Sequence, residues 1–317
     1  MSEVVAVDIG GTHARFAIAG VAEGRVIRLS DSETFKTTEH ASFQAAWEAF
    51  AELSGRPLPR AAAIAFAGPV TGDALQLTNN HWVIRPSAIP GQLGVEQSIV
   101  VNDFGAVAHA VAQAVPEHFR QVCGPDGPLP ADGIISIIGP GTGLGVAQLL
   151  RGKSGYRVVE TEGGHIAFAP LDAFEDGLLA MLRARMRRVS VERVVSGPGL
   201  RAIREALGGT FDADDGTLWA TALDGGKNVA VAALDRFCMT LGSVAGDIAL
   251  AQGANAVVIA GGLGARLADH LPRSGFAERF AAKGRFETMM RSVPVKLITL
   301  DEPGLFGAAA AFARKYP

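Results

Sequence analysis

The stretch VVAVDIGGTHARFAI, Val4 to Ile18, joins two apolar runs through a glycine turn. The first run ends in Asp8, and the second begins after Gly10, Gly11 and Thr12. This pattern predicts a β-hairpin. Adjacent glycines let backbone amides approach an anion closely, and the Asp8 carboxylate stands where a metal bound to that anion would lie. The turn therefore indicates either a site for a magnesium-chelated phosphate or an ordinary hairpin.

A second stretch repeats this design. In GIISIIGPGTGLGVAQLL, Gly133 to Leu150, an apolar strand is followed by a turn that contains Gly141, Thr142 and Gly143, and then by another strand. Neither the Walker A spacing nor the dinucleotide-binding fingerprint fits these glycines. Two similar hairpins in distant parts of the chain indicate two related domains that face one ligand.

The composition is that of an ordered globular protein. The chain has 317 residues, of which 48% are apolar and 39 are glycine, so it has room for two domains and many tight turns. A net charge of −3 gives no electrostatic case for binding nucleic acid or an anionic membrane. Cys123 and Cys238 fit neither a disulfide framework nor a zinc site, which favours a cytoplasmic location. No signal peptide is expected at the N-terminus, and charged residues within 229–251 favour a buried helix over a membrane span.

Apolar periodicity predicts strands that alternate with helices. Strands are expected at 4–8, 14–19, 25–30, 61–66, 98–101, 156–160 and 295–300, besides the second hairpin, and 256–264 is expected to be a buried strand that runs into a helix N-terminus. Helices are expected at 41–53, 87–93, 104–115 and 303–315, with a mainly helical stretch from about 175 to 252. A stretch rich in proline and glycine at 123–133 predicts a surface loop near a domain boundary. This order indicates an α/β protein with two mixed sheets and a cleft between them.

Asn102 and Asp103 stand where a predicted strand ends and a helix begins. Ligands of open α/β sheets bind at this end of the strands. Asn or Asp before an apolar helix is also a common N-cap. Both interpretations stay open, and a cap can still bind a ligand, because the helix dipole favours an ionised carboxylate.

Two further segments carry isolated polar side chains. Glu162 and His165 flank two glycines, an arrangement suited to hydrogen bonds with a polyhydroxyl ligand or to a plain surface turn. Glu192 lies among valines, either as a ligand or as a solvated glutamate at a helix start. Gly261 and Gly262 end an apolar strand, and they either admit a flat base or ribose or serve strand–helix packing. The arginines of this region are expected to form a solvated helix face, with a phosphate-binding patch as the alternative: Arg183, Arg185, Arg187 and Arg188.

The order of these motifs resembles bacterial glucokinases of the hexokinase/actin/Hsp70 ATPase superfamily. The resemblance extends from about Val4 to Arg314 and includes DIGGT, NDFGAVAHA, GPGTGLGVA, EGGHIAFAP, SVERVVSGPGL, AGGL and PGLFGAAA. It implies an α/β fold of two ribonuclease-H-like domains flanking an active-site cleft. A small domain is expected at 1–115 plus 301–317, and a large domain with helical insertions at 116–300.

The resemblance also implies roles for individual residues. The nucleotide-binding residues would be Asp8, Gly10, Gly11, Thr12, Gly141, Thr142, Gly143, Gly261 and Gly262. The sugar-binding residues would be Asn102, Asp103, Glu162, His165 and Glu192. Asp103 would be the catalytic base, and Asp8 would hold Mg²⁺ through water. The implied ligands are glucose and ATP, with neither nucleic acid nor membrane, and the implied assembly is a cytoplasmic homodimer.

The implied reaction moves the γ-phosphoryl group of MgATP to the 6-hydroxyl of glucose, the first step of glycolysis. Alternatives are a kinase for another hexose, a non-catalytic sugar or nucleotide sensor on the same fold, and an ATP-hydrolysing chaperone-like or cytoskeletal protein. Glu162, His165 and Glu192 favour the kinase. The chain departs from the family at His13, where Asn often follows the GGT turn.

Overall fold

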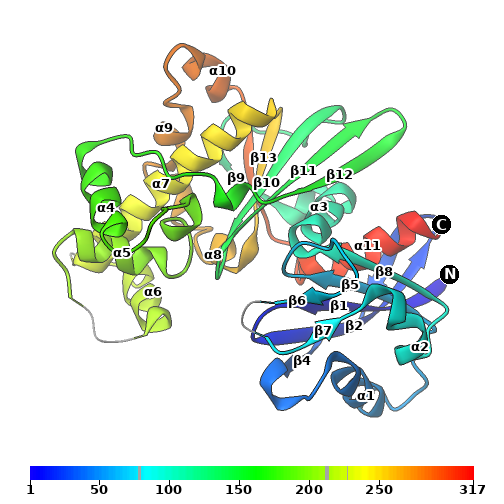
Figure 1. The fold of residues 1–317 in the computed structure, drawn as a ribbon. Coiled ribbons are helices and arrows are strands. Elements are labelled where there is room, and N and C mark those ends of the chain that lie inside the picture. Colours follow the sequence, from blue (N-terminus) through cyan, green and yellow to red (C-terminus); the bar gives the residue numbers. More distant parts are fainter. Residues whose placement is uncertain (78–79, 211–213, 227) are drawn as a thin grey trace. The chain divides into compact units, whose positions relative to one another are not determined.

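The computed structural model describes residues 1–77, 80–210, 214–226 and 228–317. They form two compact units, each with its own sheet (Figure 1). Unit 1 comprises Met1–Val115 and Leu300–Pro317, and unit 2 comprises Pro116–Thr299. The chain therefore leaves unit 1 once and returns to it at its C-terminal end. The mixed α/β fold class expected from the sequence is confirmed.

Unit 1 contains a six-stranded sheet, a two-stranded sheet and four α-helices among the described residues. The strands are β1 (Ser2–Ile9), β2 (His13–Ala22), β3 (Arg25–Leu29), β4 (Glu33–Lys36), β5 (Ala61–Phe66), β6 (Leu75–Gln76), β7 (Val83–Ile84) and β8 (Gln97–Asn102). The helices are α1 (Phe43–Ser54), α2 (Ile89–Leu93), α3 (Asp103–Gln113) and α11 (Pro303–Lys315).

The main sheet of unit 1 has the order β3-β2-β1-β5-β8, with β4 also paired to β2. β1 and β2 form the predicted antiparallel hairpin, whereas β5 and β8 continue the sheet in parallel. Alternate residues of β1 face two cores, as the period of a strand requires. Val5 and Val7 pack with the aromatic residues of α1, while Val4 and Ala6 pack against α11. Figure 1 shows α11 lying along this sheet beside α3.

Unit 2 is larger because helices are inserted between its strands. The strands are β9 (Phe119–Cys123), β10 (Gly133–Pro140), β11 (Leu144–Gly152), β12 (Gly155–Thr161), β13 (Ala256–Ile259) and β14 (Val295–Ile298). The helices are α4 (Ala173–Arg183), α5 (Gly199–Ala206), α6 (Asp215–Leu223), α7 (Val229–Gln252), α8 (Gly261–Arg266), α9 (Phe276–Ala281) and α10 (Glu287–Arg291). β4, β9, α9 and α10 lie in segments for which the sequence pattern predicts no individual element.

The sheet of unit 2 repeats the arrangement of unit 1. Its order is β12-β11-β10-β13-β14, and β9 adds an antiparallel edge strand beside β14. The first three strands are antiparallel neighbours, and β10, β13 and β14 are parallel, as are β1, β5 and β8. Each unit therefore contains a glycine hairpin whose first strand pairs on its other side with a parallel strand.

Helix α7 runs through the core of unit 2. It is the one helix of the described ranges long and apolar enough to cross a membrane, and 67% of its apolar window is buried. Its buried side chains include Leu234, Phe237 and Leu241, which belong to the main hydrophobic cluster of the unit. Burial against the protein accounts for its apolar character, in agreement with the prediction of a core helix.

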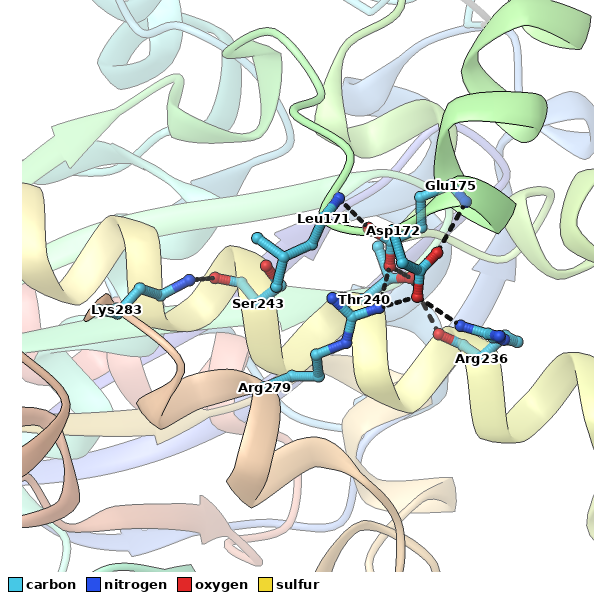
Figure 2. A network of polar contacts seen from close by, with 8 residues as sticks. All are labelled: Leu171, Asp172, Glu175, Arg236, Thr240, Ser243, Arg279 and Lys283. Atoms are coloured by element: carbon cyan, nitrogen blue, oxygen red, sulfur yellow. Dashed lines mark hydrogen bonds and ion pairs between the residues drawn. The ribbon is translucent and has the colours of Figure 1, made fainter.

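A network of charged groups joins α4, α7 and α9 (Figure 2). Glu175 is 1% exposed, and its carboxylate accepts hydrogen bonds from Leu171 N (2.7 Å), Thr240 Oγ1 (3.2 Å) and Arg279 Nη2 (3.1 Å). Asp172 caps α4 through Glu175 N and pairs with both Arg236 and Arg279. Every charge in this network has a partner, as burial requires.

Candidate active site

The first glycine turn is held from outside the hairpin. Gly10 N donates to His13 O at 2.9 Å, which closes the turn between β1 and β2. Thr37 Oγ1 donates to Gly11 O and Thr37 N donates to Thr12 O, each at 3.0 Å. The two hydrogen bonds from Thr37 fix the backbone of the turn, while the side chain of Thr12 remains exposed.

Asp8 precedes this turn and is 21% exposed at its side chain. The Arg15 guanidinium lies 3.7 Å from Asp8 Oδ2, and a Cβ on Gly304 would lie 2.6 Å from the same oxygen. Burial raises the pKa of Asp8 to about 6, Arg15 counteracts this, and the Glu302 carboxylate adds to it. The site thus offers one partly desolvated carboxylate beside the first glycine turn.

Asn102 and Asp103 stand at the same edge of the sheet as Asp8. Strands β1, β5 and β8 are parallel neighbours, with Asp8 opposite Ala65 and Ala65 opposite Val101. Two strand spacings separate the backbones at this level, about 10 Å. Asp8 and the Asn102–Asp103 pair therefore end neighbouring strands of one sheet, where α/β proteins bind ligands.

Asn102 is the N-cap of α3, as one of the two interpretations expected. Its Oδ1 accepts hydrogen bonds from Phe104 N (2.9 Å) and Gly105 N (3.0 Å), and its Nδ2 donates to Gly68 O (3.1 Å). Asp103 is the first residue of the helix and is partly exposed, and its Oδ1 accepts from Phe104 N. The Asn102 cap fixes the backbone at Asp103, so the Asp103 side chain projects from the helix N-terminus, where the helix dipole favours a negative charge.

The second glycine turn connects β10 to β11 in unit 2. Gly141 N donates to Gly143 O at 2.8 Å within the turn, and Gly197 N donates to Gly141 O at 2.7 Å from outside it. Thr142 is exposed at the tip. The segment Ser196–Gly199 therefore supports this turn, much as Thr37 supports the first one. The sequence SGPG predicts a turn at 196–199, but it does not predict the contact of this turn with the hairpin of β10 and β11.

Gly261 and Gly262 lie at the end of β13, against the same turn. Gly261 has φ +80°, and a Cβ there would lie 2.8 Å from Pro140 O. Close strand–helix packing thus requires the first of the two glycines. A Cβ on Gly262 would meet nothing within 4 Å, and this residue is exposed. Gly262 leaves open backbone beside the second hairpin.

Glu162 and His165 belong to one short turn, Gly163–His165, which is a 3₁₀ turn rather than an irregular loop. The side chains are each 56% exposed, and Nε2 of His165 lies 3.8 Å from Oε2 of Glu162. The intervening glycines pack on β11: a Cβ on Gly163 would lie 2.9 Å from Val146, and one on Gly164 would lie 2.0 Å from Leu144 O. The turn can approach the strand because it has no side chains there.

Glu192 is half-buried and stands at a helix start after Ser190, as one of the two interpretations expected, although it is only partly solvated. It lies in the 3₁₀ turn Val191–Arg193, and its Oε2 accepts a hydrogen bond from Leu144 N at 3.1 Å. Val191 N also donates to Ile166 O, which ties this turn to the segment after His165. The structure therefore brings the Glu162 turn, Glu192 and the second glycine turn together around the start of β11.

The remaining predictions concern metals and the arginines. Within the part of the chain that the structure describes, no group of three or more His, Cys, Asp or Glu side chains could hold a metal ion. The four arginines of the 183–188 region are exposed, as predicted, but the expected helix face is wrong, because α4 ends at Arg183 and the other three follow it. Thr37, Gly197 and Gly304 support the site but were not singled out as site residues, since their role depends on contacts distant in sequence.

Comparison with known proteins gives a consistent result. The glucokinase family model matches residues 5–315. A glucokinase of Zymomonas mobilis is 61% identical over 99% of this chain and 98% of its own. The crystal structure of glucokinase from an Antarctic psychrotroph is 33% identical and covers 98% of both chains, with a TM-score of 0.83. A glucokinase of the ROK family from Streptomyces griseus, in complex with glucose and AMPPNP, shares the fold at 21% identity and a TM-score of 0.66, covering 99% of this chain and all of its own.

These matches confirm the resemblance seen in the motifs and the two-domain sugar-kinase fold. They cover almost the complete length of both partners, so the likeness is not confined to the glycine hairpins. The chain belongs to the glucokinase family.

Proposed function

We propose that this protein transfers the γ-phosphoryl group of MgATP to the 6-hydroxyl of D-glucose, which gives glucose 6-phosphate and ADP. The observation that carries the proposal is the full-length identity of 61% to a glucokinase. The geometry supports it, because two turns with exposed or half-buried carboxylates and the second glycine turn meet at one strand start. The chain is an ATP-dependent hexose kinase, and the reaction would be the first step of glycolysis.

The sugar would be held by Asn102, Glu162, His165 and Glu192. An ionised carboxylate can accept hydrogen bonds from two neighbouring hydroxyls, and His165 supplies a donor or an acceptor according to its tautomer. Where sugar binding buries such polar partners, a sugar that lacks a hydroxyl is penalised. The proximity of Glu162 to His165, 3.8 Å, lets the pair act on adjacent hydroxyls.

The phosphates would be bound by the two glycine turns, Gly10–Thr12 and Gly141–Gly143, and the adenosine by Gly261 and Gly262. Mg²⁺ prefers one or two carboxylates, several waters and the phosphates of its substrate. Asp8 fits this role as a single carboxylate near the first turn. When bound, the ion would neutralise charge on the phosphates, and the backbone amides of the turns would orient them.

Asp103 would accept the proton of the 6-hydroxyl. The hydroxyl becomes acidic as its bond to phosphorus forms, so a carboxylate with an ordinary pKa suffices as the base. The position at the first turn of α3 supports this role, since the Asn102 cap holds the backbone from which Asp103 projects.

We further propose a cytoplasmic homodimer that binds neither nucleic acid nor membrane. The net charge of −3 supports the expectation that it binds neither nucleic acid nor membrane, and the two free cysteines support the cytoplasmic location. The dimer rests on the resemblance to glucokinases. Light scattering on the purified protein in dilute buffer should give twice the mass of one chain. A monomeric mass would contradict the dimer and leave the kinase proposal intact.

The activity is tested by coupled detection of ADP across a panel of hexoses. Glucose should give the highest kcat/KM, and mannose and fructose lower values. A higher kcat/KM for another hexose would show that this hexose, and not glucose, is the preferred substrate. Release of ADP without sugar, or sugar binding without release of ADP, would contradict the kinase reaction.

Asp103→Asn tests the catalytic base. We expect kcat to fall by roughly 10²- to 10⁴-fold, the usual contribution of a positioned base, while the Kd for glucose changes little. Calorimetry for binding and the coupled assay for turnover separate the two effects. Asp215→Asn is a matched control, because Asp215 is likewise the first residue of a helix, α6. Near-normal turnover of Asp103→Asn would refute the assignment.

A further inference from the structure

The carboxylate of Glu192 lies directly against the second glycine turn. Its Oε2 accepts a hydrogen bond from Leu144 N, and Leu144 is the residue that follows Gly143. A Cβ built on Gly143 would lie 2.4 Å from Oε2 and 3.2 Å from Cδ of Glu192. The resemblance to glucokinases implies that Gly143 binds the nucleotide and Glu192 binds the sugar, yet the two residues are in contact.

The backbone conformation of Gly143 does not itself require glycine. Its φ lies outside the left-handed region, so an L-residue adopts this conformation without strain. Leaving out the chain neighbours of Gly143, the three heavy atoms nearest to the Cβ position all belong to Glu192. Gly141, two residues earlier in the same turn, would place its Cβ in open space. Glycine at position 143 is thus required to make room for the Glu192 carboxylate, and not for the backbone conformation of the turn.

Leu144 also positions the other carboxylate of the proposed sugar site. Its carbonyl oxygen lies 2.0 Å from where a Cβ on Gly164 would be, so the Glu162 turn rests on this residue. Its N–H holds Oε2 of Glu192, while Oε1 has no hydrogen-bond partner among the described residues. One oxygen is therefore used for positioning, and the other is available to accept a sugar hydroxyl.

We propose that Gly143 is a positioning residue for sugar recognition. Because glycine has no Cβ, the Glu192 carboxylate can occupy the space beside residue 143. This rests on the proposed function of Glu192 as a glucose ligand. The last glycine of the phosphate-binding turn then determines the position of Glu192, which binds the sugar. The phosphate subsite and the sugar subsite are therefore linked through Gly143 and Leu144.

The test compares Gly143→Ala with Gly177→Ala, using glucose titration in the absence of nucleotide. Gly177 lies in α4, outside the proposed site, and has no left-handed φ. An added methyl at 143 displaces the carboxylate and breaks the bond to Leu144 N. Loss of a hydrogen bond to a charged group should weaken glucose binding roughly 10- to 100-fold. Gly177→Ala should leave glucose affinity within about 2-fold of wild type, since a Cβ there would meet nothing within 4 Å. Equal glucose affinities for Gly143→Ala and wild type would overturn the inference.

A second comparison asks whether Gly143 acts through Glu192. In Glu192→Ala the obstacle is gone, so adding Gly143→Ala should cost no further glucose affinity. An equal loss in both backgrounds would overturn the proposal, because it would show an independent role for Gly143. If Gly143→Ala alone does not fold, the double variant should fold, as judged by thermal unfolding, and its failure to do so would also count against the proposal.

These outcomes are distinct from failure of the proposed function. Wild-type protein from the same preparation is titrated with glucose and assayed for release of ADP. Wild type that neither binds nor phosphorylates glucose would remove the proposed function. Wild type that does both, beside a Gly143→Ala variant that binds glucose normally, would remove the positioning role alone.

Discussion

At the residue scale, a glycine lies against a carboxylate at two places in the candidate site. Gly304 leaves room for Asp8 in unit 1, and Gly143 leaves room for Glu192 in unit 2. In each case a Cβ would lie well inside contact distance of a carboxylate oxygen. Part of the high glycine content thus serves the placement of functional side chains, in addition to the tight turns expected from composition.

His109 provides a prediction on pH at this scale. Burial in α3, which is the larger cause, and the Arg314 guanidinium of α11 together lower the pKa of His109 to about 4. The unfolded chain therefore binds a proton between pH 6.5 and 4 that the folded state does not bind, and stability falls as the pH falls through this window. His109→Gln should reduce this dependence by up to one proton, or about 1.4 kcal/mol per pH unit.

The measurement is the urea midpoint of unfolding from pH 4 to 7.5. Wild type should lose more stability than His109→Gln as the pH is lowered, and the two should differ by a constant amount above pH 7. His81→Gln is the control, because His81 is exposed. Parallel profiles for wild type and His109→Gln would contradict the prediction.

At the element scale, helix positions depend on a few long-range contacts. α11 packs on α3 at Gly307, where a Cβ would lie 1.8 Å from Ala106 O. In unit 2 the charged network of Figure 2 joins α4, α7 and α9. Burial alone raises the pKa of Asp172, yet its bond from Glu175 N and its pairing with Arg236 and Arg279 outweigh burial and bring the pKa below its ordinary value.

Glu175→Ala tests this network. The change leaves Arg279, 7% exposed, without one of its two carboxylate partners and removes the acceptor for Leu171 N. Breaking a buried pair in this way should destabilise the protein by roughly 3–5 kcal/mol. Thermal and urea unfolding provide the measurement. Glu205→Ala, which removes an exposed partner of Arg185, should have a much smaller effect. Comparable losses in the two variants would show that the buried network does not stabilise the helices.

At the scale of the whole molecule, each unit has the same strand order and its own hydrophobic core. Unit 1 is completed only by the C-terminal residues Leu300–Pro317. Leu305, Ala308 and Phe312 of α11 are buried against β1, β2 and β5. The last helix of the chain is thus part of the core that supports the first glycine turn.

Removal of residues 300–317 should therefore unfold unit 1. Without α11, one face of its sheet exposes Val4, Ala6 and Ala63 to water, a loss of apolar burial that a small unit does not tolerate. Limited proteolysis should cut the truncated chain within residues 1–115, while the full chain resists at the same sites. Equal resistance would mean that unit 1 is stable without its C-terminal helix.

The local features of this protein follow from its sequence. Period-two apolar runs and glycine turns predict both hairpins, and the order of motifs identifies the family, because these signals lie within a few adjacent residues. Other features depend on the tertiary structure. The pairing of β9 with β14 and the helices α9 and α10 carry no strong local pattern. The bond between Glu192 and Leu144 joins residues 48 positions apart, and its geometry is set by how strands and turns pack. Contacts of this kind depend on the whole fold, since no short segment contains both partners.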